Sequence, residues 1–230
     1  MTKVYLEADE ISRLAEAASN LRDRLLVMLL FQLGCRISEA LALKVEDFDL
    51  KNRTVMIVRL KSHVSLACPK YGTRLSQSHR YCAKCGAETD EASRKLSEVR
   101  KQRILPMSAQ ACQMIEDYVR RNGPVRKNGV NLLFGINRHR AWQIFQECTE
   151  RAGLPKLLNP ETGKVHSVSP HRLRDAFAVN AVKHNDSGDG LRMLQEHLGH
   201  QSFNTTARYR KVAGEELRRW YEGLWKDDKA

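Results

Sequence analysis

Apolar residues recur every three or four positions along most of the chain, which is the spacing of amphipathic helices. Gly34 and Gly153 are typical of helix ends, while Asp9 and Ser38 are typical of N-caps. Helices are predicted over about residues 11–18, 21–33 and 38–43, after Pro106, around 142–148, directly after Pro170, and over about 191–198, 205–209 and 215–225.

The period of the pattern changes in two places. Residues 53–60 and 101–106 are rich in strand-forming residues and are predicted to pair as antiparallel strands. About forty residues lie between them, too many for an ordinary hairpin loop, so this segment should have structure of its own. The predicted fold is therefore mainly α with a small antiparallel β-sheet, one domain over 1–230 interrupted by an insertion at 64–100.

Composition narrows the class of protein. Hydrophobic residues make up 42% of the chain, no apolar run is long enough to span a bilayer, and no signal peptide is evident, so a cytoplasmic protein without a membrane partner is expected. Lys and Arg number 39 against 27 Asp and Glu, a net charge of +12. Such an excess predicts a polyanionic partner, because neutralising phosphates releases condensed counterions. A basic solvated surface without a partner is the alternative.

Four short segments, far apart in the chain, hold residue types that suit phosphoryl transfer. They are Gly34–Leu41, which contains Arg36 and Glu39; Ser169–Ala178, which contains His171 and Arg174; Leu198–His200; and Thr205–Tyr209.

The chemistry of phosphodiester cleavage explains why these residue types belong together. Attack on phosphorus loads charge onto the non-bridging oxygens, and two arginines can clamp those oxygens. Tyrosine is a poor nucleophile at its free pKa, so it needs activation by a group such as histidine. A lysine near the scissile phosphate can protonate the leaving oxygen. No catalytic metal or other cofactor is required.

In order and spacing, the four segments resemble the catalytic domain of the tyrosine recombinase, or phage integrase, family. The resemblance runs from about residue 6 to residue 213. It implies site-specific cleavage and rejoining of double-stranded DNA through a 3′-phosphotyrosyl intermediate. It also implies assembly as a tetramer on two DNA sites, with exchange of a C-terminal helix for which residues 215–225 are the candidate.

The resemblance assigns a role to each matching residue. Tyr209 would be the nucleophile, while Arg36 and Arg174 would clamp the phosphate. Glu39 matches the acid that supports the first arginine.

The remaining roles concern proton transfer and hydrogen bonding. His171 would be the histidine of the central pair, and His200 would donate a hydrogen bond near the nucleophile. Lys61, at the end of the first predicted strand, matches the general-acid lysine. Lys101 is the alternative, because the long insertion obscures the alignment here.

The chain departs from the family pattern in two ways. Asp175 follows Arg174, where many members have a second histidine, so the surrounding hydrogen bonds should differ. Most members also carry an N-terminal helical domain that clamps the other face of DNA, whereas the resemblance here starts near Met1. Two rival functions are a type IB topoisomerase and a DNA-binding module without catalysis; the full set of catalytic residue types argues against the second.

The insertion contains two segments that look like the knuckles of a zinc ribbon, at residues 68–72 and 82–86. Tyr71 occupies the second ligand position of the first knuckle, which leaves three thiolates. A structural zinc is predicted, bound by Cys68, Cys82, Cys85 and His79, with His63 as the alternative fourth ligand. A ribbon that folds without metal is the competing interpretation.

The remaining cysteines are expected to be buried, and the insertion is expected to be basic. Cys35, Cys112 and Cys148 lie within helical patterns and are predicted to be small core residues, reduced in the cytoplasm. Residues 62–103 hold nine Lys and Arg against four Asp and Glu, so the insertion could also contact phosphates.

Overall fold

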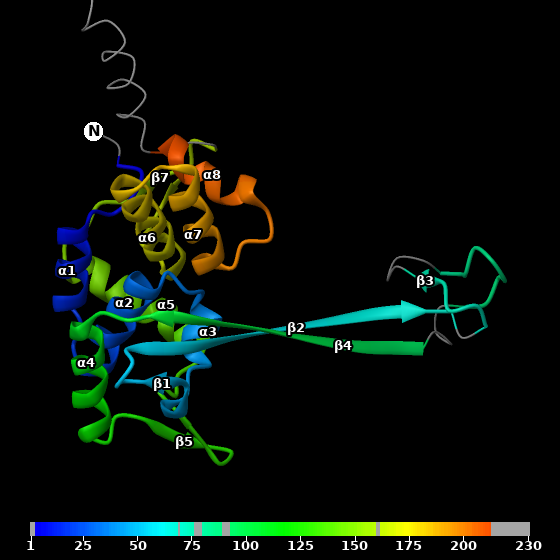
Figure 1. The fold of residues 1–230 in the computed structure, drawn as a ribbon, viewed down its shortest axis with the longest axis horizontal. Coiled ribbons are helices and arrows are strands. Elements are labelled where there is room, and N and C mark those ends of the chain that lie inside the picture. Colours follow the sequence, from blue (N-terminus) through cyan, green and yellow to red (C-terminus); the bar gives the residue numbers. More distant parts are fainter. Residues whose placement is uncertain (1–2, 69, 76–79, 89–92, 160–161, 213–230) are drawn as a thin grey trace, which may run out of the picture. The chain divides into compact units, whose positions relative to one another are not determined.

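The computed structural model describes residues 3–68, 70–75, 80–88, 93–159 and 162–212, with the backbone alone at 59–66, 74, 93–101, 211 and 212. Most of its elements are helices, and the rest form small antiparallel sheets, as the sequence predicts (Figure 1). The helices are α1 (Ala8–Glu16), α2 (Leu21–Leu33), α3 (Ile37–Leu41), α4 (Ala109–Arg120), α5 (Arg138–Arg151), α6 (Pro170–His184), α7 (Gly188–Leu198) and α8 (Phe203–Val212), with a 3₁₀ turn at Val45–Asp47. The strands are β1 (Phe48–Asp49), β2 (Thr54–Ala67), β3 (Arg74–Leu75), β4 (Ser93–Pro106), β5 (Val125–Lys127), β6 (Val130–Leu132), β7 (Leu157–Leu158) and β8 (Val165–His166).

The chain divides into two compact units. The main unit comprises Met1–Ile57 and Arg103–Ala230, and the insertion unit is Val58–Gln102. Strands β2 and β4 contribute residues to both units. The candidate helix at 215–225 and the predicted ligand His79 lie outside the described residues.

Helix α2 is the central helix of the main unit. It packs against α1, α4 and α6, and five of its leucines, Leu25, Leu26, Leu29, Leu30 and Leu33, are fully buried. Asn20 caps its N-terminus by accepting from the backbone N–H of Asp23, and Gly34 ends it with a φ of 53°. These bounds match the prediction, because both end signals are local.

Two predicted N-caps are wrong. Asp9 lies inside α1, which begins after Glu7, and Ser38 lies inside α3, which begins after Arg36. In each case a glutamate three residues on accepts from the backbone N–H of the cap residue, at 2.9 Å for Glu7 and 2.9 Å for Arg36. This glutamate satisfies the free N–H at the helix start, so a Ser or Asp is not needed there.

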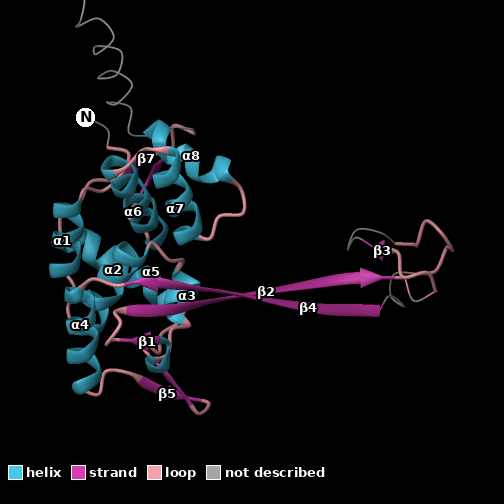
Figure 2. Ribbon diagram, viewed as in Figure 1, coloured by secondary structure: helices cyan, strands magenta, loops and turns pink. Residues whose placement is uncertain are grey.

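The strands are longer and more numerous than the sequence pattern predicts. β2 pairs with β4, whose arrow runs in the opposite direction in Figure 2, and pairs antiparallel with β1 and β3. The β5–β6 hairpin was not predicted, although Asn128 and Gly129 adopt φ of 50° and 77° in its two-residue turn. An Asn-Gly pair is a strong hairpin signal, and three-residue strands are too short to show alternation.

A second cluster of buried residues forms where α6, α7 and α8 meet. It comprises Ala178, Val179, Val182, Leu191, Leu194, Leu198 and Tyr209. The predicted core cysteines 35, 112 and 148 are all buried in the main unit. Among the residues that the structure describes, no helix has the length and apolarity needed to cross a bilayer.

Candidate active site and a cysteine cluster

The guanidinium of Arg174 joins the C-terminal ends of two helices. Its Nη1 donates to the carbonyl of Gly34, after α2, and its Nη2 donates to the carbonyl of Leu198 in α7 at 2.8 Å. Carbonyls at helix C-termini lack intrahelical partners and carry the negative end of the helix dipole, so they suit a guanidinium. Burial, followed by the charge of Arg36, lowers the pKa of Arg174 to about 10, which leaves it charged at neutral pH.

Gly34 allows α2 and α6 to approach closely at this point. A Cβ on Gly34 would lie 2.5 Å from Cδ1 of Phe177 on α6, and the φ of Gly34 is itself left-handed. The ring of Phe177 stacks on His197, with 4.7 Å between centroids, and Nε2 of His197 lies 2.9 Å from the carbonyl of Leu33. The segment that leads to Arg36 is therefore held against both α6 and α7.

Glu39 is a buried carboxylate shared by two arginines. Its Oε1 lies 3.0 Å from Nη1 of Arg36, and its Oε2 lies 2.8 Å from Nη2 of Arg103. Burial alone would raise the pKa of this carboxyl, but the hydrogen bonds from Arg103 and from the backbone N–H of Arg36 lower it to about 2. The Arg36 side chain remains 32% exposed, so part of its guanidinium is open to a ligand.

His200, one of the two predicted histidines of the site, lies just beyond Gly199, which caps the end of α7. Its Nδ1 lies 2.9 Å from the hydroxyl of Thr206, which is fully buried. Burial, followed by the charges of Arg174 and Arg36, lowers the pKa of His200 to about 4. The imidazole is thus neutral at pH 7, and its ring stacks on Tyr209 with 6.2 Å between centroids.

Tyr209 on α8 is the tyrosine of the site. The residue is 9% exposed, and its hydroxyl donates to Oδ1 of Asp175 on α6 at 3.0 Å. Burial, followed by the charge of Asp175 and this hydrogen bond, raises the pKa of Tyr209 well above its usual value of 10. Another buried tyrosine, Tyr118, donates to the carbonyl of Gly123 and belongs to the core of the main unit.

His171 and Arg174 lie three residues apart on α6 but differ in their exposure to solvent. Arg174 is 2% exposed, whereas the His171 side chain is 73% exposed and its Nε2 lies 3.9 Å from Oδ1 of Asp175. The first turn of α6 begins at Pro170, as predicted, so His171 lies near the helix end where a ligand can reach it.

The main unit thus brings together Arg36, Glu39, Arg174, His200 and Tyr209, with His171 linked through Asp175. Lys61 lies on β2 and Lys101 on β4, and only the backbone of each is described. Sequence reasoning missed Arg103, which meets Glu39 across 64 positions of the chain. No motif contains Arg103. The one feature of the sequence that could have indicated it is its position two residues after Lys101 on a predicted strand.

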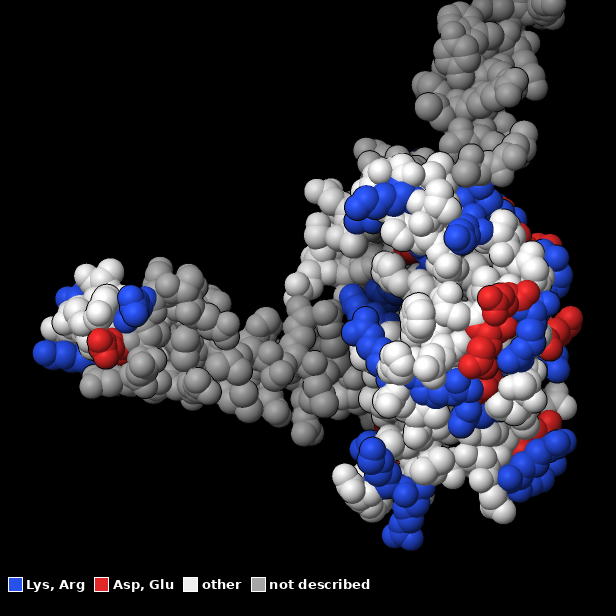
Figure 3. All heavy atoms as spheres, turned by 180° about the vertical axis from the view of Figure 1, so that it is seen from behind, with Lys and Arg blue, Asp and Glu red and all other residues white. Residues whose placement is uncertain are grey.

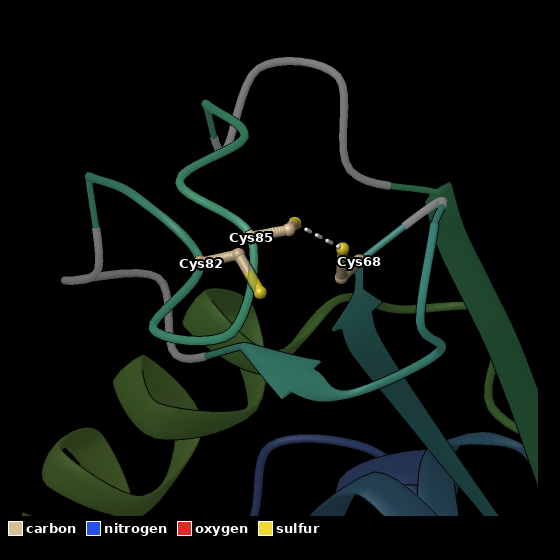
Figure 4. A group of neighbouring side chains, drawn as sticks. All are labelled: Cys68, Cys82 and Cys85. Carbon is tan, nitrogen blue, oxygen red and sulfur yellow. Dashed lines mark hydrogen bonds between the residues drawn. The ribbon is translucent and has the colours of Figure 1, made fainter.

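Three cysteines of the insertion unit form a second cluster. The Sγ atoms of Cys68, Cys82 and Cys85 all lie within 4.8 Å of one another. Figure 4 shows Cys68 at the end of β2 facing Cys85, with 3.4 Å between the two sulfurs. Backbone N–H groups, that of Lys84 first, lower the pKa of the Cys82 thiol to about 7. Three soft sulfur ligands at this separation fit a thiophilic metal ion such as Zn²⁺.

The turns that carry these cysteines have the same backbone hydrogen bonds. Cys68 N–H donates to the carbonyl of Thr73 and Gly72 N–H to that of Cys68, at 2.9 and 2.8 Å. The bonds from Cys82 to Ala87 and from Gly86 to Cys82 have lengths of 2.9 and 2.8 Å. Gly72 and Gly86 have φ of 63° and 70°. Tyr71 and Cys85 therefore occupy equivalent positions, and Tyr71 is 57% exposed.

The chain is similar to known proteins over most of its length. Tyrosine recombinase XerD of Corynebacterium glutamicum is 29% identical over 211 residues, which cover 89% of this chain and 53% of that protein. Tyrosine recombinase XerA of Pyrococcus horikoshii is 27% identical over 222 residues, covering 93% of this chain and 58% of that protein. The chain thus spans little more than half the length of these curated relatives.

Solved structures share the fold. A crystal structure of XerA recombinase matches with a TM-score of 0.64 at 23% identity, covering 98% of this chain and 66% of that chain. The Tn1549 transposon integrase, solved in complex with transposon right end DNA, matches with a TM-score of 0.57 at 16% identity, covering 96% of this chain and 66% of that one. The sequence also matches the profile of the phage integrase family over residues 4–95 and 95–216, and the chain belongs to that family.

Proposed function

We propose that this chain cleaves and rejoins DNA at specific sites, with Tyr209 attacking a phosphodiester to form a 3′-phosphotyrosyl intermediate. One observation carries the proposal: a buried tyrosine hydroxyl lies near the charge of Arg174 and beside the ring of His200, groups from three separate segments. The names of the relatives, tyrosine recombinases, support the same chemistry.

Arg36 and Arg174 are proposed to stabilise the charge that develops on the phosphate. Arg36 is partly exposed and is fixed by Glu39, so it can meet a phosphate without losing side-chain freedom at that moment. Arg174 uses two donors on helix-end carbonyls, and a guanidinium has five N–H groups, so donors remain. Its charge lies in a poorly solvated place, where it acts strongly on a nearby anion.

His200 and His171 are proposed as hydrogen-bond donors to the phosphate. A Thr206 hydroxyl that donates to Nδ1 of His200 would leave the proton of the neutral imidazole on Nε2, free to donate. His171 is exposed at the start of α6, so a bound phosphate can reach it.

The general acid is proposed to be Lys61, with Lys101 as the alternative. The two lysines lie on β2 and β4, which pair with each other. Protonation of the leaving 5′-oxygen by either would complete the cleavage step.

Double-stranded DNA is the proposed partner, bound by a tetramer of this chain in the cytoplasm. The net charge of +12 supports it, and Figure 3 shows Lys and Arg spread over the side of the main unit that faces the viewer, with Asp and Glu in smaller groups. Arg126 and Lys127 are exposed on the β5–β6 hairpin and can contact phosphates. The helix proposed for exchange between subunits, 215–225, is not among the described residues.

Two rivals share parts of this site: a type IB topoisomerase and a DNA-binding module without catalysis. Covalent complexes trapped on genomic DNA would first give the target sequence. Supercoiled plasmids carrying one or two copies of that sequence then separate the functions. Recombination that needs paired sites supports the proposal. Relaxation regardless of site would indicate the topoisomerase, and binding without any adduct would indicate the silent module.

The insertion at 64–100 is proposed to be a zinc-ribbon-like module that binds one structural Zn²⁺. Cys68, Cys82 and Cys85 would supply three thiolates, and His79 is favoured over His63 as the fourth ligand. His79 and the side chain of His63 lie outside what the structure describes, so the three convergent sulfurs carry this proposal. The metal would stabilise a segment whose described buried cluster, of Cys68, Leu75 and Cys82, is small.

A further inference from the structure

The hydroxyl of Tyr209 has a carboxylate as its acceptor in the main unit. Oδ1 of Asp175 lies 3.0 Å from this hydroxyl, within the range of a good hydrogen bond. Asp175 is the residue that replaces the second histidine found in many members of the family. It directly follows Arg174 on α6, so the same turn of helix presents the phosphate-clamping arginine and this acceptor.

The carboxylate is held in place from its other side. Nη1 of Arg172 lies 3.3 Å from Oδ2 of Asp175, and the side chains of both residues are 19% exposed. His171 approaches Oδ1 at 3.9 Å. Oδ2 is therefore paired with Arg172 while Oδ1 accepts from Tyr209, an arrangement that fixes the acceptor before any substrate binds.

The two histidines of the site are less well placed to accept this proton. Nδ1 of His200 is paired with Thr206, and the ring contacts Tyr209 by stacking. His171 is 73% exposed and approaches Asp175. Of the described contacts to the phenol oxygen, the hydrogen bond to Asp175 is the one to a proton acceptor.

The environment of Tyr209 also makes a proton acceptor necessary. Burial and the charge of Asp175 raise the pKa of Tyr209, so the phenolate is scarce near neutral pH. A phenol that cannot ionise beforehand must lose its proton during the attack.

We propose that Asp175 is the general base of the cleavage step, an inference that rests on the proposed function. As the bond from Oη of Tyr209 to phosphorus forms and the bond from phosphorus to the 5′-oxygen breaks, the phenol proton moves to Oδ1 of Asp175. The leaving 5′-oxygen takes a proton from the general acid, so no net charge is created. In rejoining, the 5′-oxygen attacks phosphorus and gives its proton back to the general acid. The bond from phosphorus to Oη of Tyr209 breaks, and Asp175 returns its proton to that oxygen.

The pH dependence of cleavage tests this role. Asp175→Asn keeps the size of the side chain and an oxygen that can accept the hydrogen bond, but it cannot take the proton. Cleavage of a nicked suicide substrate at pH 7 should slow by roughly a hundredfold or more. The variant must ionise the phenol first, so its rate should climb about tenfold per pH unit from about pH 6 to about pH 9, and the loss should shrink as the pH rises.

The charged groups around Tyr209 and Asp175 also affect the pH profile, so the variants compared should leave all of these groups except Asp175 unchanged. Titratable or charged side chains near Tyr209 or Asp175 are His171, Arg172 and Arg174 on α6, His200 after α7 and Arg208 on α8. Asp186→Asn is the matched control, because Asp186 is an exposed acid paired with Arg210, and its cleavage profile should equal that of the wild type.

A substrate with sulfur in place of the 5′-bridging oxygen separates the base from the acid. A thiolate leaves without a proton, so this substrate should rescue Lys61→Ala but not Asp175→Asn. Asp175→His provides a second variant with an acceptor at this position. It should cleave faster than Asp175→Asn and lose rate as the pH falls below about 6.5.

Several results would overturn the inference. Unchanged or faster cleavage by Asp175→Asn would mean that the contact restrains Tyr209, and a loss equal at every pH would mean a structural role. Asp175→His with the wild-type rate and profile would also refute it. A wild-type protein that forms no adduct, or forms it on another tyrosine, would instead refute the proposed function, and this inference with it.

Discussion

Arg103 donates two hydrogen bonds to the carboxylate of Glu39, at 2.8 Å from Nη2 to Oε2 and at 3.3 Å from Nη1 to Oε1. Glu39 also binds the side chain and backbone N–H of Arg36. One carboxylate therefore links the start of α3 to the end of β4, and it fixes an arginine proposed to bind phosphate. A charge-assisted, two-point contact of this kind has a defined geometry as well as strength.

Loss of this carboxylate should destabilise the fold in a pH-dependent way. A pKa of about 2, against an ordinary value of 4.5, corresponds to a stabilisation on the order of 3 kcal/mol. Because the folded pKa is the lower one, this stabilisation is present above about pH 4.5 and disappears as the pH falls towards 2. Urea unfolding of Glu39→Gln should show its largest deficit at neutral pH. Glu116→Gln, at an exposed position of α4, is the control; an equal deficit at pH 3 and pH 7 would contradict the assignment.

Gly34→Ala should lower the free energy of unfolding by more than a glycine-to-alanine substitution normally does. Both strain at φ 53° and a clash with the Phe177 ring would arise, and the carbonyl that accepts from Arg174 would move. Gly153→Ala is a matched control, since Gly153 has φ 60° and no atom within 4 Å of an added Cβ. In thermal unfolding, we expect Gly153→Ala to lower the free energy of unfolding by about 1 kcal/mol and Gly34→Ala to lower it by at least twice as much. Equal losses would mean that Phe177 moves aside freely.

Tyr209→Phe should abolish the covalent DNA adduct while leaving DNA binding nearly unchanged. The ring keeps its packing in the cluster of α6, α7 and α8, and the attacking oxygen is lost. Denaturing gels on a nicked suicide substrate report the adduct. Tyr118→Phe removes a different buried hydroxyl and should retain cleavage. An adduct that persists in Tyr209→Phe, or that maps to Tyr118 or Tyr221, would refute the assignment.

Arg36→Lys and Arg174→Lys should each slow cleavage on the order of a hundredfold or more, although the charge is kept. Lysine cannot present two planar donors to two phosphate oxygens, and at position 174 it cannot reach both helix-end carbonyls in the same way. Single-turnover cleavage is the measurement, with Arg24→Lys at an exposed position of α2 as the control. Near-normal rates would identify either residue as structural.

Metal removal should affect the insertion unit and spare catalysis at the phosphate. Elemental analysis should find about one zinc per chain, lost in Cys85→Ser and kept in Cys112→Ala, whose cysteine lies in the main core. Chelation should remove hydrogen-exchange protection from residues near 64–100 and weaken DNA binding, while the main unit stays folded. Protection that survives in metal-free protein would favour a ribbon that folds without an ion.

Much of the fold could be predicted because its signals are local. Pro170 and Gly34 mark a helix start and a helix end through their own backbone preferences. Four motifs of the site were visible for the same reason, since each is a short run on one element. Arg103 and the hydrogen bond from Tyr209 to Asp175 were not predictable, because they depend on how distant elements pack. The exposure of His171 beside the burial of Arg174 likewise depends on which side of α6 the neighbouring helices cover.

The matching hydrogen bonds of the two cysteine turns bear on how the site could have arisen. The turn at Cys68 keeps its backbone geometry with tyrosine at the position equivalent to Cys85, so this geometry comes from the glycine and the chain rather than from a fourth sulfur. Either tyrosine codon becomes a cysteine codon by changing a single nucleotide. The present gene therefore lies one point mutation away from encoding a fourth cysteine at this position, and drift in either direction across that step would leave the backbone of both turns intact.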